Sequence, residues 1–371
     1  MRIRIDATPL LLRSAGIKNY LYYWIRSLQE AAAPNTSIEV FPYIRRLGPL
    51  NHDGSILGSW NTWARLGLIQ GFNRVLPAVL ESISRGLSVF HYSNQLRVPI
   101  RRVPMTATLY DVTPLLMPEY HTGAIVTADR HYTGRIIKQA RGLIAISHNT
   151  RNDAVRYLGL LPESITVIYP GVPDSFFLAT ETQAAAAATK YRLTRPYVLF
   201  VGTLEPRKNI DMLLDAWMAL PDAHREEHDL VIAGPIGWAK QSTIDRVRNS
   251  GAGIRTLGYV PEDSLPGLTK GALALAYPSL YEGFGLPLAQ AMAAGVPAIT
   301  SSTSCLPEVA GDGALTVDPR SRQELGTALD AVLTSPSLRA RLAAAGRERA
   351  AVFRWDRCAR ESIDFFRRVV G

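Results

Sequence analysis

Two loop segments in the second half of the chain carry charged residues whose types suit phosphate and sugar chemistry. The first reads Gly-Thr-Leu-Glu-Pro-Arg-Lys-Asn over residues 202–209, follows an apolar run and precedes a helical pattern. A guanidinium and an ammonium on one loop, here Arg207 and Lys208, neutralise a diphosphate and stabilise it as a leaving group. The alternative is a pair of solvated loop charges.

The second segment reads Ser-Leu-Tyr-Glu-Gly-Phe-Gly-Leu-Pro-Leu-Ala-Gln over residues 279–290 and places Glu282 directly before a glycine-rich turn. Gly283 and Gly285 let the backbone approach a ligand closely, and the N–H groups that begin the following helix suit a diphosphate. A carboxylate beside this site would repel phosphate, so we expect Glu282 to face neutral hydroxyls such as those of a sugar. The alternative is an ordinary glycine-rich loop with a solvent-facing glutamate.

Two weaker candidates lie in the first half. Gly16, within Ser-Ala-Gly-Ile-Lys-Asn-Tyr over 14–20, resembles half of a phosphate-binding loop, although a turn glycine explains it equally simply. Asp111 follows an apolar run and is a candidate general base or hydroxyl ligand, or else a turn aspartate. The sequence has no Asp-x-Asp triplet and no histidine cluster with metal-ligand spacing, so we expect neither a metal nor another cofactor.

Short apolar runs rich in β-branched residues alternate with helical patterns along the whole chain, which is typical of parallel βαβ units. The pattern occurs twice and predicts an α/β protein of two facing, Rossmann-like doubly wound domains with a cleft between them. Loops at the carboxyl ends of the strands would carry the site. The predicted strands are residues 3–6, 38–44, 88–92, 105–110, 143–146 and 165–169, followed by 197–202, 230–234, 254–257, 273–277, 296–300 and 314–317.

The alternation is interrupted near residues 177–196, where five alanines occupy positions 184–188. This predicts an N-terminal domain over 1–178, a linker over 179–195, with a short helix in the linker as an alternative, and a C-terminal domain over 196–371. A last helix over about 355–371, with apolar Ile363, Phe366 and Val370, either stays with the C-terminal domain or packs back on the N-terminal one.

Charge is unevenly distributed over the 371 residues, whose net charge is +9. Residues 1–180 hold 19 Lys and Arg against 11 Asp and Glu, whereas residues 181–371 hold 22 against 21. The basic half, with an apolar stripe at Leu57, Trp60, Ala64 and Leu68, suits an anionic membrane surface; alternatively the stripe packs within its own domain. A nucleic-acid partner is not expected, because no binding module is recognised.

The cellular compartment of the protein can be inferred from features that the sequence lacks. No apolar run approaches the ~18 residues that span a bilayer, and the first residues lack the pattern of a signal peptide. Two cysteines cannot form a disulfide framework. We therefore expect a cytoplasmic protein, with peripheral contact at the inner membrane surface as a further possibility.

Together these segments resemble glycosyltransferase family 4, the retaining nucleotide-sugar transferases of the GT-B fold. They are similar in particular to bacterial mannosyl- and rhamnosyltransferases of polysaccharide assembly. The segments that carry the resemblance span residues 110–121, 144–150, 165–172, 201–209, 257–260, 277–297 and 306–314. The resemblance implies catalytic roles for Asp111, Arg207, Lys208 and Glu282, and donor-binding roles for Gly16, Val260, Gly283, Phe284, Gly285, Leu286 and Gln290.

Four positions depart from the family pattern. Thr203 replaces the arginine of its commoner Gly-Arg-Leu version, which leaves Arg207 as the replacement, and Ala15 replaces the first of its paired first-loop glycines. Gln290 replaces the second acid of its E-x7-E motif, whose first acid is Glu282, and a neutral amide accepts weaker hydrogen bonds from a ribose than a carboxylate does. Tyr110 replaces the histidine of the family's His-Asp pair, whose acid is Asp111. In the family this pair lies in the part of the cleft that binds the acceptor.

The resemblance implies a metal-independent hexosyltransferase, with mannose from GDP-mannose as the first expectation and a glycan or lipid-linked sugar as acceptor. It also implies front-face displacement, in which the departing diphosphate accepts the proton of the acceptor hydroxyl. A UDP- or dTDP-sugar-dependent transferase of the same family remains an alternative. So does a protein that binds nucleotide sugars without transferring them.

Overall fold

The computed structural model describes residues 1–371 except 13–15, 45, 51–53, 75–76, 250 and 252. The chain forms two compact units. The first comprises Met1–Gly171 together with Arg354–Gly371, and the second is Val172–Phe353. Each of the twelve strands predicted from the sequence is present, with ends that differ by at most three residues, so the prediction of an α/β protein with two parallel sheets is confirmed.

The first unit contains a six-stranded sheet in the order β2-β1-β3-β4-β5-β6, and every neighbouring pair is parallel. Ile3 of β1 lies opposite Ile38 of β2 and Val89 of β3. The strands are β1 (Arg2–Asp6), β2 (Ser37–Phe41), β3 (Val89–Tyr92), β4 (Met105–Leu109), β5 (Gly142–Ala145) and β6 (Ile165–Val167), and the longer helices are α1 (Gly16–Ala31), α2 (Ser59–Arg74), α3 (Pro77–Ile83), α5 (Gly123–Arg135), α6 (His148–Leu158) and α17 (Trp355–Val370).

Helices cover both faces of this sheet, which explains why its strands are apolar on both sides. On one face, Phe90 of β3 packs in a core with Phe72 of α2 and Leu80 of α3. On the other face, the ring of His91 lies 4.9 Å from that of Trp24 in α1. The successive residues Phe90 and His91 therefore serve opposite cores, as the pleat of a strand requires.

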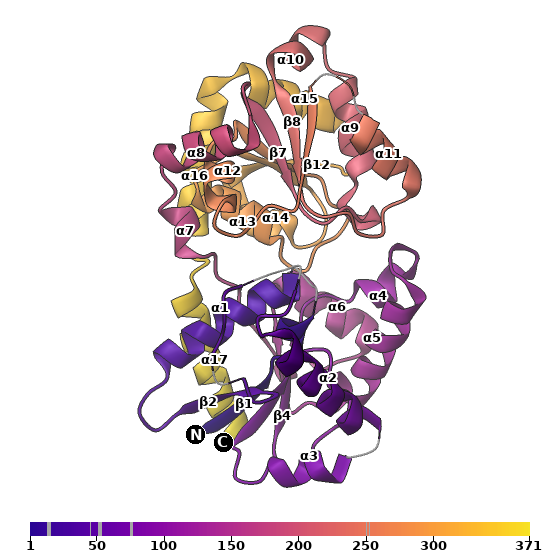
Figure 1. The fold of residues 1–371 in the computed structure, drawn as a ribbon, viewed down its shortest axis with the longest axis vertical. Helices are drawn as coiled ribbons and strands as arrows, with labels where there is room; N and C mark the ends of the chain where they lie inside the picture. The colour runs from indigo at the N-terminus through magenta and orange to yellow at the C-terminus, as the bar shows by residue number, and fades with distance from the viewer. Residues whose placement is uncertain (13–15, 45, 51–53, 75–76, 250, 252) are drawn as a thin grey trace. The chain divides into compact units, whose positions relative to one another are not determined.

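The last helix belongs to the first unit, where α17 lies beside α1 (Figure 1). Trp24 of α1 donates a hydrogen bond from its indole N–H to the hydroxyl of Ser362 (2.9 Å). Ile363 and Phe366 are buried as expected, but Val369 takes the inward position that we assigned to Val370, which is exposed. The reason is a contact with a distant part of the chain: Val369 meets the amino end of β5, where a Cβ on Gly142 would lie 2.8 Å from its side chain.

The second unit contains a parallel sheet in the order β12-β11-β10-β7-β8-β9. Its first strand, β7, lies between β8 and β10, so the chain winds outward in one direction and then the other. The strands are β7 (Tyr197–Val201), β8 (Asp229–Ala233), β9 (Ile254–Gly258), β10 (Ala274–Tyr277), β11 (Ala298–Ser301) and β12 (Ala314–Val317), and the helices include α8 (Glu181–Tyr191), α9 (Ile210–Met218), α11 (Gln241–Asn249), α12 (Leu265–Lys270), α13 (Leu286–Ala293), α15 (Arg322–Thr334) and α16 (Pro336–Ala350).

The segment expected to be a linker, 179–195, is instead part of the second unit and holds helix α8. Thr180 and Gln183 form a reciprocal capping box at its start. Ala184 and Ala187 are buried, and a Cβ on Gly267 of α12 would lie 2.5 Å from the backbone of Gln183. The alanines are thus a close-packed helix face, because small side chains let two helices approach each other.

Candidate functional site

The two charged segments of the second unit meet at the point where the winding of its sheet reverses. Residues 202–209 follow β7 and residues 278–285 follow β10, and these two strands are neighbours. The N–H of Leu280 donates to the carbonyl oxygen of Arg207 (2.9 Å), which joins the loops directly. Ligands of doubly wound sheets bind at this reversal point.

Glu282 accepts hydrogen bonds from both predicted cations. Arg207 Nη1 donates to Glu282 Oε2 (2.8 Å), and Lys208 Nζ donates to Glu282 Oε1 (2.6 Å). Arg207 Nη2 also donates to Glu205 Oε1 (2.6 Å), and Lys208 Nζ to the hydroxyl of Tyr277 (2.7 Å). We call these five residues the ion cluster. It combines two positive and two negative side chains, so it is neutral in the ligand-free state.

Burial and neighbouring charge shift the pKa of Glu282 in opposite directions. Burial alone raises the pKa of a carboxyl group, but the charges of Arg207 and Lys208 and their hydrogen bonds lower the pKa of Glu282 to about 2. Burial, followed by the negative charge of Glu282, raises the pKa of Tyr277 well above its usual value. The Tyr277 hydroxyl remains protonated and donates to Glu282 Oε1 (2.9 Å). Glu282 is therefore a carboxylate throughout the physiological pH range.

Neighbouring loops fix the backbone around Glu282. Its N–H donates to the hydroxyl of Ser304 (3.1 Å), and the thiol of Cys305 donates to its carbonyl oxygen (3.1 Å). Asn209 donates through Nδ2 to the carbonyl oxygens of Pro278 (3.1 Å) and Pro319 (2.7 Å). The carboxylate is thus held in place before any ligand arrives, which lowers the entropic cost of binding.

The glycine-rich turn has the geometry expected of it at Gly285. This residue caps α13 with φ of 88°, in the left-handed region, and a Cβ on it would lie 2.8 Å from Leu306. Phe284, just before it, is buried with its ring edge-on to Phe353. A side chain at position 285 would be strained and would clash, so the turn requires glycine.

The structure therefore brings Arg207, Lys208 and Glu282 together. Glu282 is buried between the two cations, so the alternative of a solvent-facing glutamate is wrong. Gln290 is buried on α13, eight residues further along, and Val260 is buried just after β9. Gly283 and Leu286 lie within the turn and at the first position of α13.

The first-unit candidates form no comparable cluster. Gly16 begins α1, and a Cβ on it would find no atom within 4 Å, so no close approach requires glycine there. The preceding residues of its motif, 14 and 15, lie outside the described part of the chain. Asp111 Oδ1 accepts from the N–H (3.0 Å) and the hydroxyl (2.7 Å) of Thr113. This is the geometry of the turn aspartate that we considered as an alternative.

Two neighbours modify the surroundings of Asp111. Burial and then the charge of Asp111 raise the pKa of Asp129 to about 6. Tyr110, which stands where the family has histidine, packs edge-on against Tyr20 (5.4 Å between ring centroids), and burial raises the pKa of its phenol well above the usual value.

Sequence reasoning missed Glu205 and Tyr277 as members of the ion cluster. Glu205 lies inside the first motif, and its buried pairing with Arg207 could have been suspected from the two-residue separation. Tyr277 is the last residue of an apolar strand and looks like an ordinary core aromatic. Its polar role depends on β10 lying next to β7, which local sequence does not reveal.

Two features are absent from the described residues: a group of metal ligands and a helix that could span a membrane. Within the described residues, the structure has no group of three or more His, Cys, Asp and Glu side chains placed to hold a metal ion. None of the helices in that same part of the chain is both long and apolar enough to cross a bilayer.

Comparison with family models gives two matches that follow each other along the chain. Residues 15–176 match the model described as Glycosyltransferase Family 4. Residues 182–349, which contain the whole ion cluster, match the model described as Glycosyl transferases group 1.

Two kinds of curated relative from Escherichia coli are similar over about 75% of this chain. O-antigen chain mannosyltransferase B is 31% identical over 283 residues, which is 74% of its own length. Serotype-specific mannosyltransferase WbdA is 26% identical over 288 residues. Here the matched part is only 35% of the relative, so this chain spans about a third of its length.

Solved structures share the arrangement of elements at low sequence identity. Sucrose-phosphate synthase from Thermosynechococcus elongatus superimposes with a TM-score of 0.75 at 19% identity and covers 99% of this chain and 98% of that one. HepE from Anabaena, in complex with UDP-glucose, gives a TM-score of 0.73 at 17% identity over 98% and 100% of the two chains. WaaG, a glycosyltransferase involved in lipopolysaccharide biosynthesis, gives 0.70 at 15% identity over 99% of each.

Proposed function

Because this chain belongs to glycosyltransferase family 4 and has the α/β architecture of GT-B glycosyltransferases, we propose that it transfers mannose from GDP-mannose to a glycan or lipid-linked acceptor. That it is a glycosyltransferase follows from its family. The sugar, the nucleotide and the acceptor are our proposal, and the mannosyltransferase names of the first relatives support the sugar.

The observation that carries the proposal is the buried carboxylate of Glu282 between Arg207 and Lys208. Lys208 has three ammonium N–H groups, and described residues accept from two of them. The third can donate to a phosphate oxygen of the donor. Each oxygen of Glu282 has two lone-pair directions, so the carboxylate can accept from a sugar hydroxyl while it keeps the cations in place.

The same arrangement suggests how the leaving group is stabilised. As the bond between sugar and diphosphate breaks, negative charge grows on the diphosphate. Cations that are already fixed by Glu205 and Glu282 need little reorganisation to meet that charge, and such preorganised groups provide much of the electrostatic stabilisation in enzymes. Backbone N–H groups that begin α13 would add to this stabilisation.

We further propose that transfer retains the configuration of the sugar and needs no divalent metal. In this proposal the departing diphosphate takes the proton of the acceptor hydroxyl on the same face of the sugar. Proton NMR of the product reports the configuration of the new linkage, and transfer at an unchanged rate in EDTA is the result expected without a metal. A β-linkage from GDP-α-mannose, or loss of transfer in EDTA, would contradict the respective proposal.

The donor nucleotide can be tested by thermal unfolding. A ligand that binds only the folded protein raises its melting temperature, so GDP at saturating concentration is expected to raise Tm by several degrees, and more than UDP or dTDP at the same concentration. A larger shift with UDP would favour a UDP-sugar donor, an alternative supported by the UDP-glucose complex of the structurally similar HepE. Lys208→Met is the control, because it removes a proposed phosphate contact and should reduce the shift.

Transfer itself needs a second assay, since binding alone would also fit a nucleotide-sugar-binding protein. Labelled GDP-mannose is incubated with mannose-terminated glycans and lipid-linked sugars, and labelled product is measured. Binding of GDP-mannose without transfer or hydrolysis across the acceptor panel would favour the binding protein, which the departures at Gln290 and Tyr110 make worth testing.

We also propose that the enzyme is cytoplasmic and contacts an anionic membrane through its first unit. That unit holds 24 Lys and Arg against 13 Asp and Glu, whereas the second holds 17 against 19. The predicted apolar stripe divides in the structure, because Leu68 packs on the core while Trp60 is 85% exposed. Trp63 is 72% exposed on the same helix, so α2 presents two exposed tryptophans in the unit that carries the excess of positive charge.

Exchange of both tryptophans for serine, Trp60→Ser with Trp63→Ser, is expected to weaken binding to anionic vesicles at least about tenfold. Each indole would lose its apolar burial at the membrane, and 1.4 kcal/mol corresponds to a factor of ten. Co-sedimentation with phosphatidylglycerol vesicles measures the effect. Tyr157→Ser, which removes an exposed aromatic from α6 of the same unit, is the control. Equal recovery with neutral and anionic vesicles would exclude the electrostatic contribution.

A further inference from the structure

A row of arginines lies along the amino-terminal edge of the sheet in the first unit. Arg2 begins β1, Arg85 precedes β3, Arg101 and Arg102 precede β4, and Arg141 precedes β5. These four strands are neighbours in the sheet. The edge is opposite to the one whose loops carry the candidate residues of this unit, so the row has no part in the proposed sugar transfer. Its arginines do contribute to the positive charge on which the proposed membrane contact rests.

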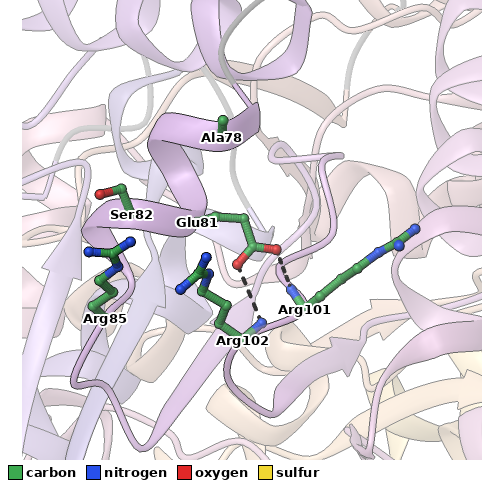
Figure 2. A pocket seen from close by; sticks show the side chains of 6 residues that line it. All are labelled: Ala78, Glu81, Ser82, Arg85, Arg101 and Arg102. Atoms are coloured by element: carbon green, nitrogen blue, oxygen red, sulfur yellow. Dashed lines mark hydrogen bonds between the residues drawn. The ribbon is translucent and has the colours of Figure 1, made fainter.

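Two of these arginine-bearing segments surround a hollow of about 350 Å³ at the end of α3. The carboxylate of Glu81 accepts the backbone N–H groups of Arg101 (2.6 Å) and Arg102 (3.3 Å), as Figure 2 shows. The N–H of Arg85 donates to the carbonyl oxygen of Ser82 (3.2 Å). Both segments are therefore tied to α3, and their side chains start from fixed positions.

The side chains of Arg85 and Arg102 point toward one another across this hollow, and Arg101 also lines it, with its side chain directed away from these two (Figure 2). Among the residues that the structure describes, neither facing guanidinium has an ion pair or a side-chain hydrogen bond. The carboxylate of Glu81 is occupied by the backbone. Two positive charges that face each other repel, and an anion between them would remove the repulsion.

A phosphoryl group fits this arrangement better than a single-atom anion. Each guanidinium presents a planar fork of N–H donors that matches two phosphate oxygens, and the hydroxyl of Ser82 also lines the hollow. We propose that the hollow formed by Ser82, Arg85 and Arg102 binds a phosphoryl group, presented either by a lipid headgroup or by a soluble phosphate ester.

The test compares a double variant, Arg85→Gln with Arg102→Gln, with the single variant Arg141→Gln, which removes an exposed arginine of the same edge that does not line the hollow. Pyrophosphate binding is measured by calorimetry, and vesicle binding by co-sedimentation with phosphatidylcholine that contains or lacks phosphatidic acid. We expect the double variant to bind one probe at least about tenfold more weakly than wild type and Arg141→Gln to differ by less than about twofold. Every pyrophosphate titration contains saturating GDP, which occupies the proposed donor site, so that the remaining pyrophosphate binding reports on the hollow.

Each outcome has a defined meaning. Weaker pyrophosphate binding with unchanged vesicle binding supports a soluble ester, and loss of the phosphatidic-acid dependence supports a lipid headgroup. A double variant that binds both probes as tightly as Arg141→Gln does overturns the proposal. Unchanged Tm and glycosyl transfer in the double variant show that it is folded. The comparison does not depend on the identity of the donor sugar, so failure of the proposed function would leave it valid.

Discussion

Replacement of Lys208 by methionine is expected to lower kcat of glycosyl transfer by about 10²- to 10³-fold, the range found when one preorganised donor to a developing negative charge is removed. Methionine keeps much of the length of lysine but has no charge and no N–H. The buried ammonium now contacts Glu282 and Tyr277, so its loss leaves Glu282 Oε1 with a single hydrogen bond, from the Tyr277 hydroxyl. Initial rates at saturating donor separate this effect on kcat from weaker donor binding.

Lys240→Met is the matched control, because Lys240 is an exposed lysine of the same unit. Its rate should remain within about twofold of wild type. Circular dichroism and Tm of Lys208→Met should show a folded protein, since Arg207 still pairs with Glu282. Near-wild-type turnover of Lys208→Met would remove this residue from the proposed site.

The second large effect concerns stability and its dependence on pH. The folded-state pKa of Glu282 is about 2, below the usual 4.5 of a glutamate. A carboxyl group whose pKa is lowered on folding stabilises the protein above its unfolded pKa, and that stabilisation is lost as pH falls through the folded value. We therefore expect Glu282→Gln to lower the unfolding free energy of the second unit by about 3 kcal/mol at pH 7. The difference from wild type should shrink between about pH 4.5 and pH 2.

Hydrogen exchange of the slowest amides in β7 and β10 measures the unfolding free energy of this unit by itself. Glu227→Gln, at an exposed glutamate of the same unit, is the control and should match wild type at every pH. A Glu282→Gln variant with a constant deficit from pH 7 to pH 2 would show that the effect comes from packing and not from the ionised carboxylate.

Much of the architecture could be predicted from local sequence. The strand at 197–201 is a short apolar run between Pro196 and Gly202, and the strand at 274–277 is one that ends before Pro278. A strand that is buried on both faces has apolar residues at successive positions, so it can be recognised as such a run. The motifs around Lys208 and Glu282 can likewise be recognised from sequence, because each is one continuous segment between a strand and a helix. Such a loop needs particular residue types in a fixed order along the chain. Spacing thus predicted where the charged loops lie along the chain.

Other predictions failed where the outcome depended on contact with a distant element. The alanines of α8 were interpreted as a linker because a run of alanines shows no periodicity of large apolar and polar side chains. Their burial depends on helix α12, against which they pack. Val369 and Val370 differ in burial because of Gly142, more than two hundred residues earlier. Helical periodicity could not choose between two adjacent valines without that neighbour.

By itself, the sequence of this protein determined its fold class and its family, and it predicted Arg207, Lys208 and Glu282 as site residues. Each of these inferences rests on local patterns. Only the tertiary structure decided that Glu282 lies between the two cations, that Glu205 and Tyr277 join them, and that Arg85 faces Arg102. The physical reason is the order of strands in each sheet. Crossover connections bring residues together that are tens of positions apart, and that order is set by the packing of the whole unit.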